Sequence, residues 1–411
     1  MEKKKKPAIR FKGFTDSWEQ RKLGDVASSF EYGLNAAAKA YDGEYKYIRI
    51  TDIDDNTHEF LTDNLTSPDI DLIGADNYKL TEGDILFART GASVGKSYIY
   101  RNSDGLVYYA GFLIRARINE EYDEEFVFQN TLTDRYNKYI AVTSQRSGQP
   151  GVNAQEYAEF EINVPKKEEQ TKIGTYFRNL DYLITLHQRK YDKLQIIKKS
   201  MLEKMFPQNG SCFPEIRFKG FTDSWEQRKL GELAEIVGGG TPSTSVESYW
   251  DGDIDWYAPA EIGEQIYLKS SQRKITEEGL NKSSAKVLPV GTVLFTSRAG
   301  IGKTAILLKE GCTNQGFQSI VPNKDKLDSY FIFTRSEELK RYGETVGAGS
   351  TFVEVSGKQM ANMELMMPTI MDEQQKIGEY FSNLDHLITL HQREVEKLQN
   401  IKKSMLETMF V

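Results

Sequence analysis

The sequence predicts an α+β protein with two mixed α/β domains joined by two long antiparallel coiled-coil helices, arranged as a pseudo-twofold tandem repeat. Two observations carry this prediction. Residues 9–24 recur letter for letter as residues 216–231. Of the 35 residues in 172–206, 27 are identical to those at 376–410. A chain of 411 residues is also longer than a domain with one hydrophobic core usually is. A duplicated unit of about half this length accounts for the size.

The repeated segments alternate with two segments of domain length that share few residues with each other. We call these two segments the variable domains and the repeated segments the scaffold. The expected segments are the first repeated segment (1–24), the first variable domain (25–165), the first helix (166–207), the second copy of the repeated segment (208–231), the second variable domain (232–368) and the second helix (369–411).

The composition limits the class of protein. Hydrophobic residues make up 39% and charged residues 27%, a soluble globular balance without a run long enough to span a membrane. Cys212 and Cys312 offer neither a disulfide framework nor a zinc cluster, which favours a reducing, cytoplasmic setting. The formal net charge of −7 argues against non-specific coating of nucleic acid, but it allows local basic surfaces.

Short apolar runs between Gly, Asn and Asp predict strands in both variable domains. In the first domain they are residues 47–50, 84–88, 98–100 and 112–114. In the second domain they are residues 293–296, 305–308 and 319–321. The variable domains are therefore expected to be mixed α/β rather than helical.

A basic motif lies between two predicted strands of each domain. In the first domain the motif consists of Arg89, Gly91, Gly95, Lys96 and Ser97. In the second domain the corresponding residues, aligned one to one, are Arg298, Gly300, Gly302, Lys303 and Thr304. A glycine-rich hairpin lets backbone amides and two cations approach a phosphate or a base edge. The alternative interpretation is a plain hairpin with solvated charges.

The same motif resembles a phosphate-binding loop only at first sight. That loop requires a glycine where this chain has Thr90 and Ser297, and it requires a helix after the lysine. Both copies continue into a predicted strand. Nucleotide binding is therefore not expected.

Polar loops late in each domain add candidate readers, because Gln, Asn, Arg and Ser pair with base edges in a major groove. The same residues are also common in ordinary loops. Together with the basic motif, the expected DNA contacts are Arg89, Lys96, Ser97, Arg146, Gln149, Arg298, Lys303, Thr304, Gln315, Gln318 and Thr351.

Heptad spacing in the two long helices predicts a helix-pair interface. Its expected residues are Leu180, Ile184, His187, Leu194, Met201, Leu384, Ile388, His391, Leu398 and Met405, with Lys198 and Lys402 interrupting the seam. Residues 168–206 carry eight cations and five carboxylates, and residues 372–410 carry five and seven, so pairing with each other is favoured over self-pairing. The alternative is that each helix packs on its own variable domain.

Two residue types within the helices are open to a second interpretation. His187 and His391 suggest a metal site, but they lack carboxylates or cysteines at ligand spacing, so a polar pair that fixes register is favoured. Gly174 and Gly378 are expected to weaken the first turns. No catalytic set stands out elsewhere in the sequence.

The ordered motifs of the whole chain resemble those of type I restriction–modification specificity (S) subunits. They are Arg-Phe-x-Gly-Phe-x-x-x-Trp at 10–18 and 217–225, Leu-Gly-Glu-Leu-Ala at 230–234, Gly-Gly-Thr-Pro-Ser at 239–243, Thr-Ser-Arg-Ala-Gly-Ile-Gly-Lys-Thr at 296–304, and Glu-Gln-x-Lys-Ile-Gly at 169–174 and 373–378. The first domain departs from this pattern at residues 32–35, Tyr-Gly-Leu-Asn, as expected for a domain that reads different DNA.

This resemblance implies two target-recognition domains, each reading one half of a bipartite, asymmetric site in double-stranded DNA, with the helix pair setting the gap. It implies docking of two methylation (M) subunits and of restriction (R) translocase/nuclease subunits. S-adenosylmethionine, ATP and Mg²⁺ would bind to those partners, and this chain would be non-catalytic, with no cofactor or metal of its own. The rival interpretations are a nucleotide-using enzyme and a coiled-coil protein that binds other proteins.

Overall fold

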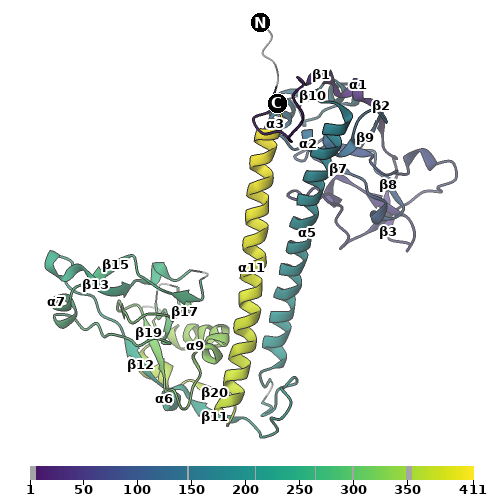
Figure 1. The fold of residues 1–411 in the computed structure, drawn as a ribbon. Coiled ribbons are helices and arrows are strands. Elements are labelled where there is room, and N and C mark those ends of the chain that lie inside the picture. The colour runs from purple at the N-terminus through teal and green to yellow at the C-terminus, as the bar shows by residue number, and fades with distance from the viewer. Residues whose placement is uncertain (1–5, 146–147, 209, 264, 299, 349–353) are drawn as a thin grey trace. The chain divides into compact units, whose positions relative to one another are not determined.

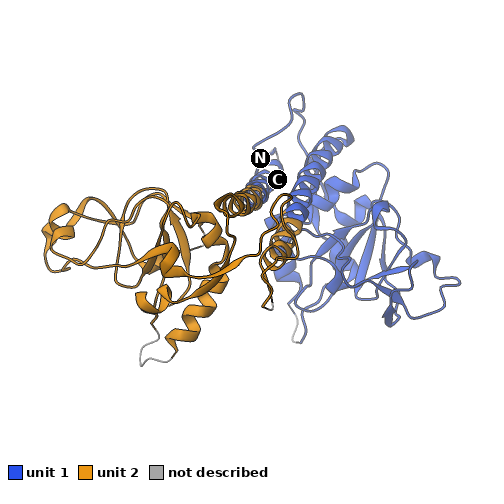
Figure 2. Cartoon of the chain, turned by 90° about the horizontal axis from the view of Figure 1, so that it is seen from below, with its two compact units in different colours: residues 1–190, 391–411 blue, residues 191–390 orange. Residues whose placement is uncertain are grey.

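A computed structural model describes residues 6–145, 148–208, 210–263, 265–298, 300–348 and 354–411. Its contacts divide the chain into two compact units, residues 1–190 with 391–411 (unit 1) and residues 191–390 (unit 2), coloured separately in Figure 2. Each unit takes in part of both long helices, α5 (Lys167–Lys204) and α11 (Met371–Met409). Within the described ranges, no helix is long and apolar enough to cross a membrane.

Unit 1 is built on a four-stranded antiparallel sheet in the order β2–β9–β6–β7. Figure 1 labels β2, β9 and β7 of this sheet. Its strands are β2 (Ala27–Tyr32), β6 (Ile85–Ala88), β7 (Ser97–Ile99) and β9 (Leu113–Ile118). Smaller ladders join β3 (Ala38–Ala40) to β5 (Thr66–Pro68) and, in parallel, β4 (Lys46–Ile48) to β8 (Val107–Tyr109). The remaining elements are β1 (Glu19–Lys22) paired with β10 (Glu161–Val164), α1 (Leu23–Val26), α2 (Glu124–Asn130), α3 (Asp134–Thr143) and α4 (Ala154–Ala158).

Unit 2 repeats this plan with a five-stranded sheet in the order β12–β19–β16–β17–β14. Its strands are β12 (Ala234–Gly238), β14 (Tyr267–Leu268), β16 (Val293–Phe295), β17 (Thr304–Leu307) and β19 (Gln318–Pro322). A second sheet contains β13 (Trp250–Tyr257), β15 (Arg273–Ile275) and β18 (Cys312–Thr313). The other elements are β11 (Glu226–Lys229) paired with β20 (Glu364–Met367), α6 (Leu230–Leu233), α7 (Glu277–Asn281), α8 (Ser329–Thr334), α9 (Ser336–Gly347) and α10 (Gly357–Ala361).

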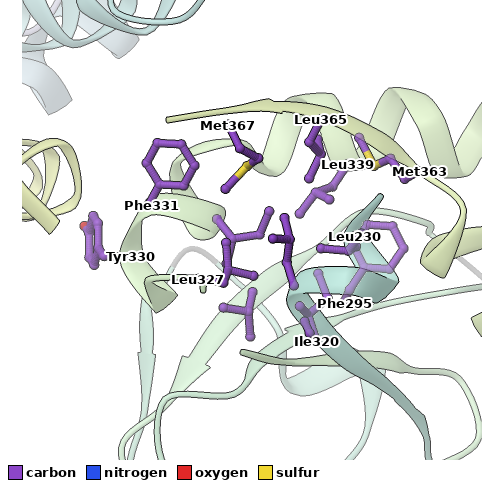
Figure 3. Packing of buried hydrophobic residues seen from close by; sticks show 14 of the residues in the cluster. Leu230, Phe295, Ile320, Leu327, Tyr330, Phe331, Leu339, Met363, Leu365 and Met367 are labelled. Atoms are coloured by element: carbon purple, nitrogen blue, oxygen red, sulfur yellow. The ribbon is translucent and has the colours of Figure 1, made fainter. Parts of the chain in front are cut away.

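The predicted mixed α/β class and the predicted strands are confirmed, with shifts of one or two residues at their ends, except that the strand expected at 112–114 continues to Ile118. The strand expected from residue 112 begins at Leu113, so Phe112 stands just outside β9. In unit 2 the sheet packs its apolar face against helices, and Figure 3 shows Phe295, Ile320 and Leu339 gathered in that core.

The two long helices run antiparallel within each unit, as predicted. In unit 1, Asp181 of α5 forms an ion pair with Lys402 of α11 (2.6 Å). In unit 2, Lys198 of α5 forms an ion pair with Asp385 of α11 (2.5 Å). The two lysines that interrupt the apolar seam are therefore matched by carboxylates of the opposing helix, which corrects their interpretation as simple interruptions.

The repeated segment before each domain is tied to the start of a long helix. Arg10 forms a double hydrogen bond with Glu169 (2.5 and 2.6 Å), and Arg217 forms the same pair with Glu373 (2.6 and 2.8 Å). Both carboxylates are buried, so a two-pronged guanidinium is a favourable partner for them. This pairing gives the two sequence-identical segments a structural role.

The glycines near the start of each long helix have a packing role that the sequence interpretation missed. A Cβ on Gly174 would stand 2.4 Å from Asp123 Oδ1, and a Cβ on Gly378 would stand 2.6 Å from Asp328 Oδ1. These two aspartates are the N-caps of α2 and α8. Each glycine therefore allows a helix start to approach the long helix closely, and its cost in helix propensity is offset by that contact.

Candidate nucleic-acid interface

The basic motif forms a β-hairpin in each unit, between β6 and β7 and between β16 and β17. The four motif glycines have φ values from 78° to 106°, the left-handed region that favours glycine. A strand follows the lysine in both copies, as predicted. The backbone geometry is therefore that of a tight hairpin and not that of a phosphate-binding loop.

The backbone ladder corrects the alignment of the two motifs. The amide of Arg89 donates to Phe112 O (3.1 Å), whereas in unit 2 the amide of Ser297 donates to Gly316 O (2.8 Å). Arg89 therefore corresponds to Ser297, and Arg298 stands one position later. The reason is that the first hairpin loop, residues 88–96, is one residue longer than the second, residues 296–303.

This offset of one residue changes how each arginine is placed, because neighbouring residues of an extended chain point to opposite sides. In unit 2, Arg298 Nε lies 3.6 Å from the position that a Cβ on Gly316 would occupy. In unit 1 the corresponding position carries the side chain of Phe112. Each unit thus brings an arginine to this part of the hairpin, but from adjacent positions and with different neighbours.

The arginine of unit 1 lines an open groove of about 820 Å³. The described residues that line it include Arg49 and Arg89 but neither Asp nor Glu. Asp52 binds Arg49 through two hydrogen bonds of 2.8 Å, which raises the pKa of that guanidinium and occupies two of its five donors. Within the described part of the chain, Arg89 has no such carboxylate partner, so its donors remain for a ligand.

Aromatic side chains hold the guanidinium of Arg89. Its central carbon lies 5.0 Å from the ring centre of Tyr32 and 6.0 Å from that of Phe112. Phe112 is 61% exposed, an unusual state for a phenylalanine. Gln149, also exposed, lines the same groove, so the structure brings these two expected DNA contacts together.

The rest of the first motif faces the interior of unit 1. The ammonium of Lys96 bonds to Ile53 O (2.9 Å) and forms an ion pair with Asp55, and its side chain is only 10% exposed. Ser97 is fully buried, and its hydroxyl pairs with that of Thr131 (2.7 Å). This burial is at odds with the expected DNA contact of Ser97, because no atom of its side chain faces solvent.

In unit 2 the expected contacts separate into two groups. Arg298 and Gln315 flank Gly316, and the Thr241 hydroxyl donates to the Gln315 amide oxygen. Lys303 is exposed at the other end of the hairpin. Gln318 is half-buried within β19.

Thr304 is tied to the unit by a hydroxyl pair with Ser336 (2.7 Å), the counterpart of the Ser97 pair. The hydroxyl residue of the motif thus has a packing role in both units. Arg146 and Thr351 lie outside the described residues.

The ten expected helix-pair residues are all buried or half-buried. His187 Nδ1 lies 2.9 Å from His391 Nδ1, so one ring donates and the other accepts. Burial is the largest cause that lowers the pKa of His391, and electrostatic repulsion from His187 and Lys190 lowers it further. Across the described ranges, no group of three or more His, Cys, Asp or Glu side chains is arranged to hold a metal ion.

The sequence interpretation missed Tyr32 and Phe112. The register pairs Tyr32 with Ile114 and Gly238 with Gln318, so the Tyr32–Gly33 pair corresponds to Gly238–Gly239. A Cβ would stand 2.2 Å from Ala110 O on Gly33 and 1.9 Å from Asn314 O on Gly239. Aligning the chain on these glycines, and not on the arginines, would have placed Tyr32 opposite Gly238, but the proximity of Phe112 comes from the structure alone.

Comparison with known proteins agrees with this architecture. Residues 15–195 and 222–400 match the family described as the type I restriction modification DNA specificity domain. A type I restriction enzyme MjaIX specificity subunit of Methanocaldococcus jannaschii is 34% identical over 202 residues, which are 48% of this chain and 46% of that protein. The putative type I restriction enzyme MjaX specificity subunit of the same organism is 26% identical over 96% of this chain and 93% of its own length.

A crystal structure of a type I restriction-modification S subunit from M. genitalium has a similar fold, with a TM-score of 0.68, 13% identity and 99% of each chain covered. The family match covers most of the chain, in two copies that contain the two hairpins and most of each long helix. The chain therefore belongs to the type I restriction–modification DNA specificity family and carries two copies of its domain.

Proposed function

We propose that this chain reads a bipartite, asymmetric site in double-stranded DNA, with unit 1 contacting one half-site and unit 2 the other. The observation that supports this proposal is the contrast between the two hairpins. Both contain two strands, left-handed glycines and a hydroxyl pair. They differ where Arg89 and its two aromatic neighbours, Tyr32 and Phe112, correspond to Ser297, Gly238 and Gly316. Two hairpins of the same backbone plan that carry different side chains at equivalent positions are expected to recognise different base sequences.

The chain is the specificity part of a type I complex, and the specificity part is non-catalytic. Two methylation subunits and the restriction subunits are the proposed partners, docked on the scaffold that the helices provide. S-adenosylmethionine, ATP and Mg²⁺ then belong to the partners. The proposed setting is the cytoplasm, where such a complex meets incoming DNA.

The expected interface consists of Arg89 and Gln149 in unit 1 and of Arg298, Lys303 and Gln315 in unit 2. Each of these five residues is exposed or half-exposed, and the charged ones have no carboxylate partner among the described residues. Because arginine and glutamine donors pair with base edges and lysine pairs with phosphate, they supply both specificity and affinity.

Site selection from a random double-stranded DNA library by the complex of this chain with its methylation subunits tests the proposal. We expect an enriched site with two unlike specific parts separated by unspecified bases. A continuous or palindromic site, or no enrichment over random DNA, would contradict it. Titration of the same complex with ATP and of the isolated chain with ATP separates the nucleotide-enzyme alternative, which requires binding by the chain alone.

A further inference from the structure

We propose that Arg89 reads a guanine in the half-site of unit 1 and that Tyr32 and Phe112 are the positioning residues that hold it. This inference rests on the proposed function and adds the base and the residues. Guanine presents two acceptors, O6 and N7, on its major-groove edge, and an arginine guanidinium matches both with parallel N–H donors. A phosphate contact by the same arginine would carry no base preference.

The first support is the way in which Arg89 is held. Its guanidinium carbon lies 5.0 Å from one ring centre and 6.0 Å from the other, so the cation is attracted to both π faces. Contact with ring faces restricts the guanidinium and leaves its N–H groups, which lie in its plane, for another partner. The backbone is fixed as well, because the Arg89 carbonyl accepts from Val152 N (2.9 Å). Such prior ordering favours base recognition over a mobile phosphate contact.

The second support is the absence of an internal partner. Among the described residues, no side-chain or backbone oxygen accepts a hydrogen bond from the Arg89 guanidinium, whereas the nearby Arg49 donates two hydrogen bonds to Asp52. Arg89 also lines the 820 Å³ groove, whose described lining has no carboxylate. A cation that lines a groove without carboxylates in its described lining favours a ligand that is anionic and rich in hydrogen-bond acceptors.

The third support is the exposed aromatic surface beside the arginine. Phe112 is 61% exposed and Tyr32 is 43% exposed, and both line the groove with Arg89. Tyr32 is itself anchored, since its hydroxyl accepts a hydrogen bond from Ala154 N (3.3 Å). The aromatic surface lies beside the arginine and would be covered by the edge of the groove when Arg89 bonds to a base, which removes apolar area from water when DNA binds.

The corresponding place in unit 2 is built differently, which makes the inference specific to one half-site. Tyr32, Arg89 and Phe112 correspond to Gly238, Ser297 and Gly316. The space left by these small residues admits Arg298, whose Nε lies close to Gly316. Arg298 has no aromatic pair beside it among the described residues, so its substitution is a matched control in the other unit.

Methylated-site mapping with the complete methyltransferase complex tests this inference. We expect R89A to relax one position of one half-site, with the preference for guanine there falling about 10- to 100-fold while the other half-site stays unchanged. R89K keeps the charge but not the fork of donors, so it is expected to weaken the same preference with an unchanged salt dependence of binding. F112A is expected to give an intermediate loss, and R298A is expected to affect only the other half-site.

Several outcomes would overturn the inference. One is a wild-type site with no G·C pair in the half-site that R89A affects. Another is retention of the guanine preference in R89K, or a uniform loss of methylation in R89A with an unchanged site, which is the signature of a phosphate contact. If the thermal unfolding of R89A shows that it does not fold, the methylated sites of R89K and F112A decide whether the inference holds. If the wild-type complex methylates no bipartite site, the proposed function fails first, and this result is distinct from the others.

Discussion

At the scale of single residues, the lysines of the two hairpins hold equivalent ladder positions in different surroundings. The amide of Ala88 donates to Lys96 O and the amide of Thr296 donates to Lys303 O. Lys96 is turned inward onto Ile53 O and Asp55, whereas Lys303 is exposed. The lysine of the motif therefore has a structural role in unit 1, whereas in unit 2 it is exposed, and its proposed role is a phosphate contact.

This contrast predicts opposite effects for one substitution made twice. We expect K303A to weaken DNA binding by the complex for all sequences alike and to reduce the slope of log affinity against log salt by about one. K96A is expected to lower the thermal stability of unit 1 and to leave that slope unchanged, since its ammonium is occupied. Salt titrations and melting curves of both variants check this. A reduced slope in K96A together with an unchanged slope in K303A would contradict it.

The close contact at Gly378 predicts a second single-residue effect. In G378A the new Cβ would meet Asp328 Oδ1, the N-cap oxygen of α8, so a packed contact must open. We expect a loss of about 1–3 kcal/mol in the free energy of unfolding, despite the better helix propensity of alanine. N383A, on an exposed position of the same helix, is expected to change that free energy by less than about 0.5 kcal/mol. Urea unfolding measures both, and a stabilised G378A would contradict the account.

At this scale the sequence predicted the order of strands and hairpins, but it did not predict the burial and the partners of individual side chains. The strand–hairpin–strand order around Lys303 follows from glycines and β-branched runs, which are local signals. The burial of Ser97 and the inward turn of Lys96 depend on Thr131 and Ile53, 34 and 43 residues away. The one-residue offset of Arg298 is set by the ladder that pairs Ser297 with Gly316. A single sequence contains no local sign of such partners, so these residues were grouped by motif alone.

At the scale of elements, the helix pair was predictable because its seam repeats in the sequence. The heptad spacing identified the apolar residues and both histidines, and the opposite net charges of the helices favoured their pairing. The pairing of Lys198 with Asp385 and of Lys402 with Asp181 was not predictable from spacing along one helix. It requires the register between two helices, which only the packed structure supplies.

The histidine pair of this element predicts a pH dependence. Burial and its neighbours lower the pKa of His391 below its ordinary value of about 6.5, so below that pH the unfolded chain binds more protons than the folded one. The stabilising effect is present above about pH 6.5 and is lost as the pH falls toward the lowered pKa. We expect the melting temperature to fall between about pH 7.5 and pH 5.5, and H391Q to reduce that fall.

Two comparisons complete this prediction. H386Q changes an exposed histidine of the same helix and is expected to keep the wild-type pH dependence. Burial also lowers the pKa of His58, so part of the acid sensitivity is expected to remain in H391Q. A pH dependence of H391Q identical to that of the wild type would show that the pair does not titrate on unfolding.

At the scale of the whole molecule, the helix pair is proposed to set the gap in the DNA target. Four residues inserted near Gln195 add about one turn, or ~6 Å of helical rise, and shift the heptad seam only by a stutter. Since B-DNA rises ~3.4 Å per base pair, we expect the gap to widen by one or two base pairs while both half-sites stay the same. Mapping of methylated sites measures the gap. An active complex with the original spacing would rule out the helix pair as the ruler.

The central claim is that each variable domain reads its own half of the target. Replacing residues 25–165 with the corresponding segment of another family member tests it most directly, because the long helices and the second domain remain intact. Methylated-site mapping of the resulting complex should show one half-site changed, to that of the donor protein, and the other half-site and the gap preserved. A change in both half-sites, or in neither, would contradict the account.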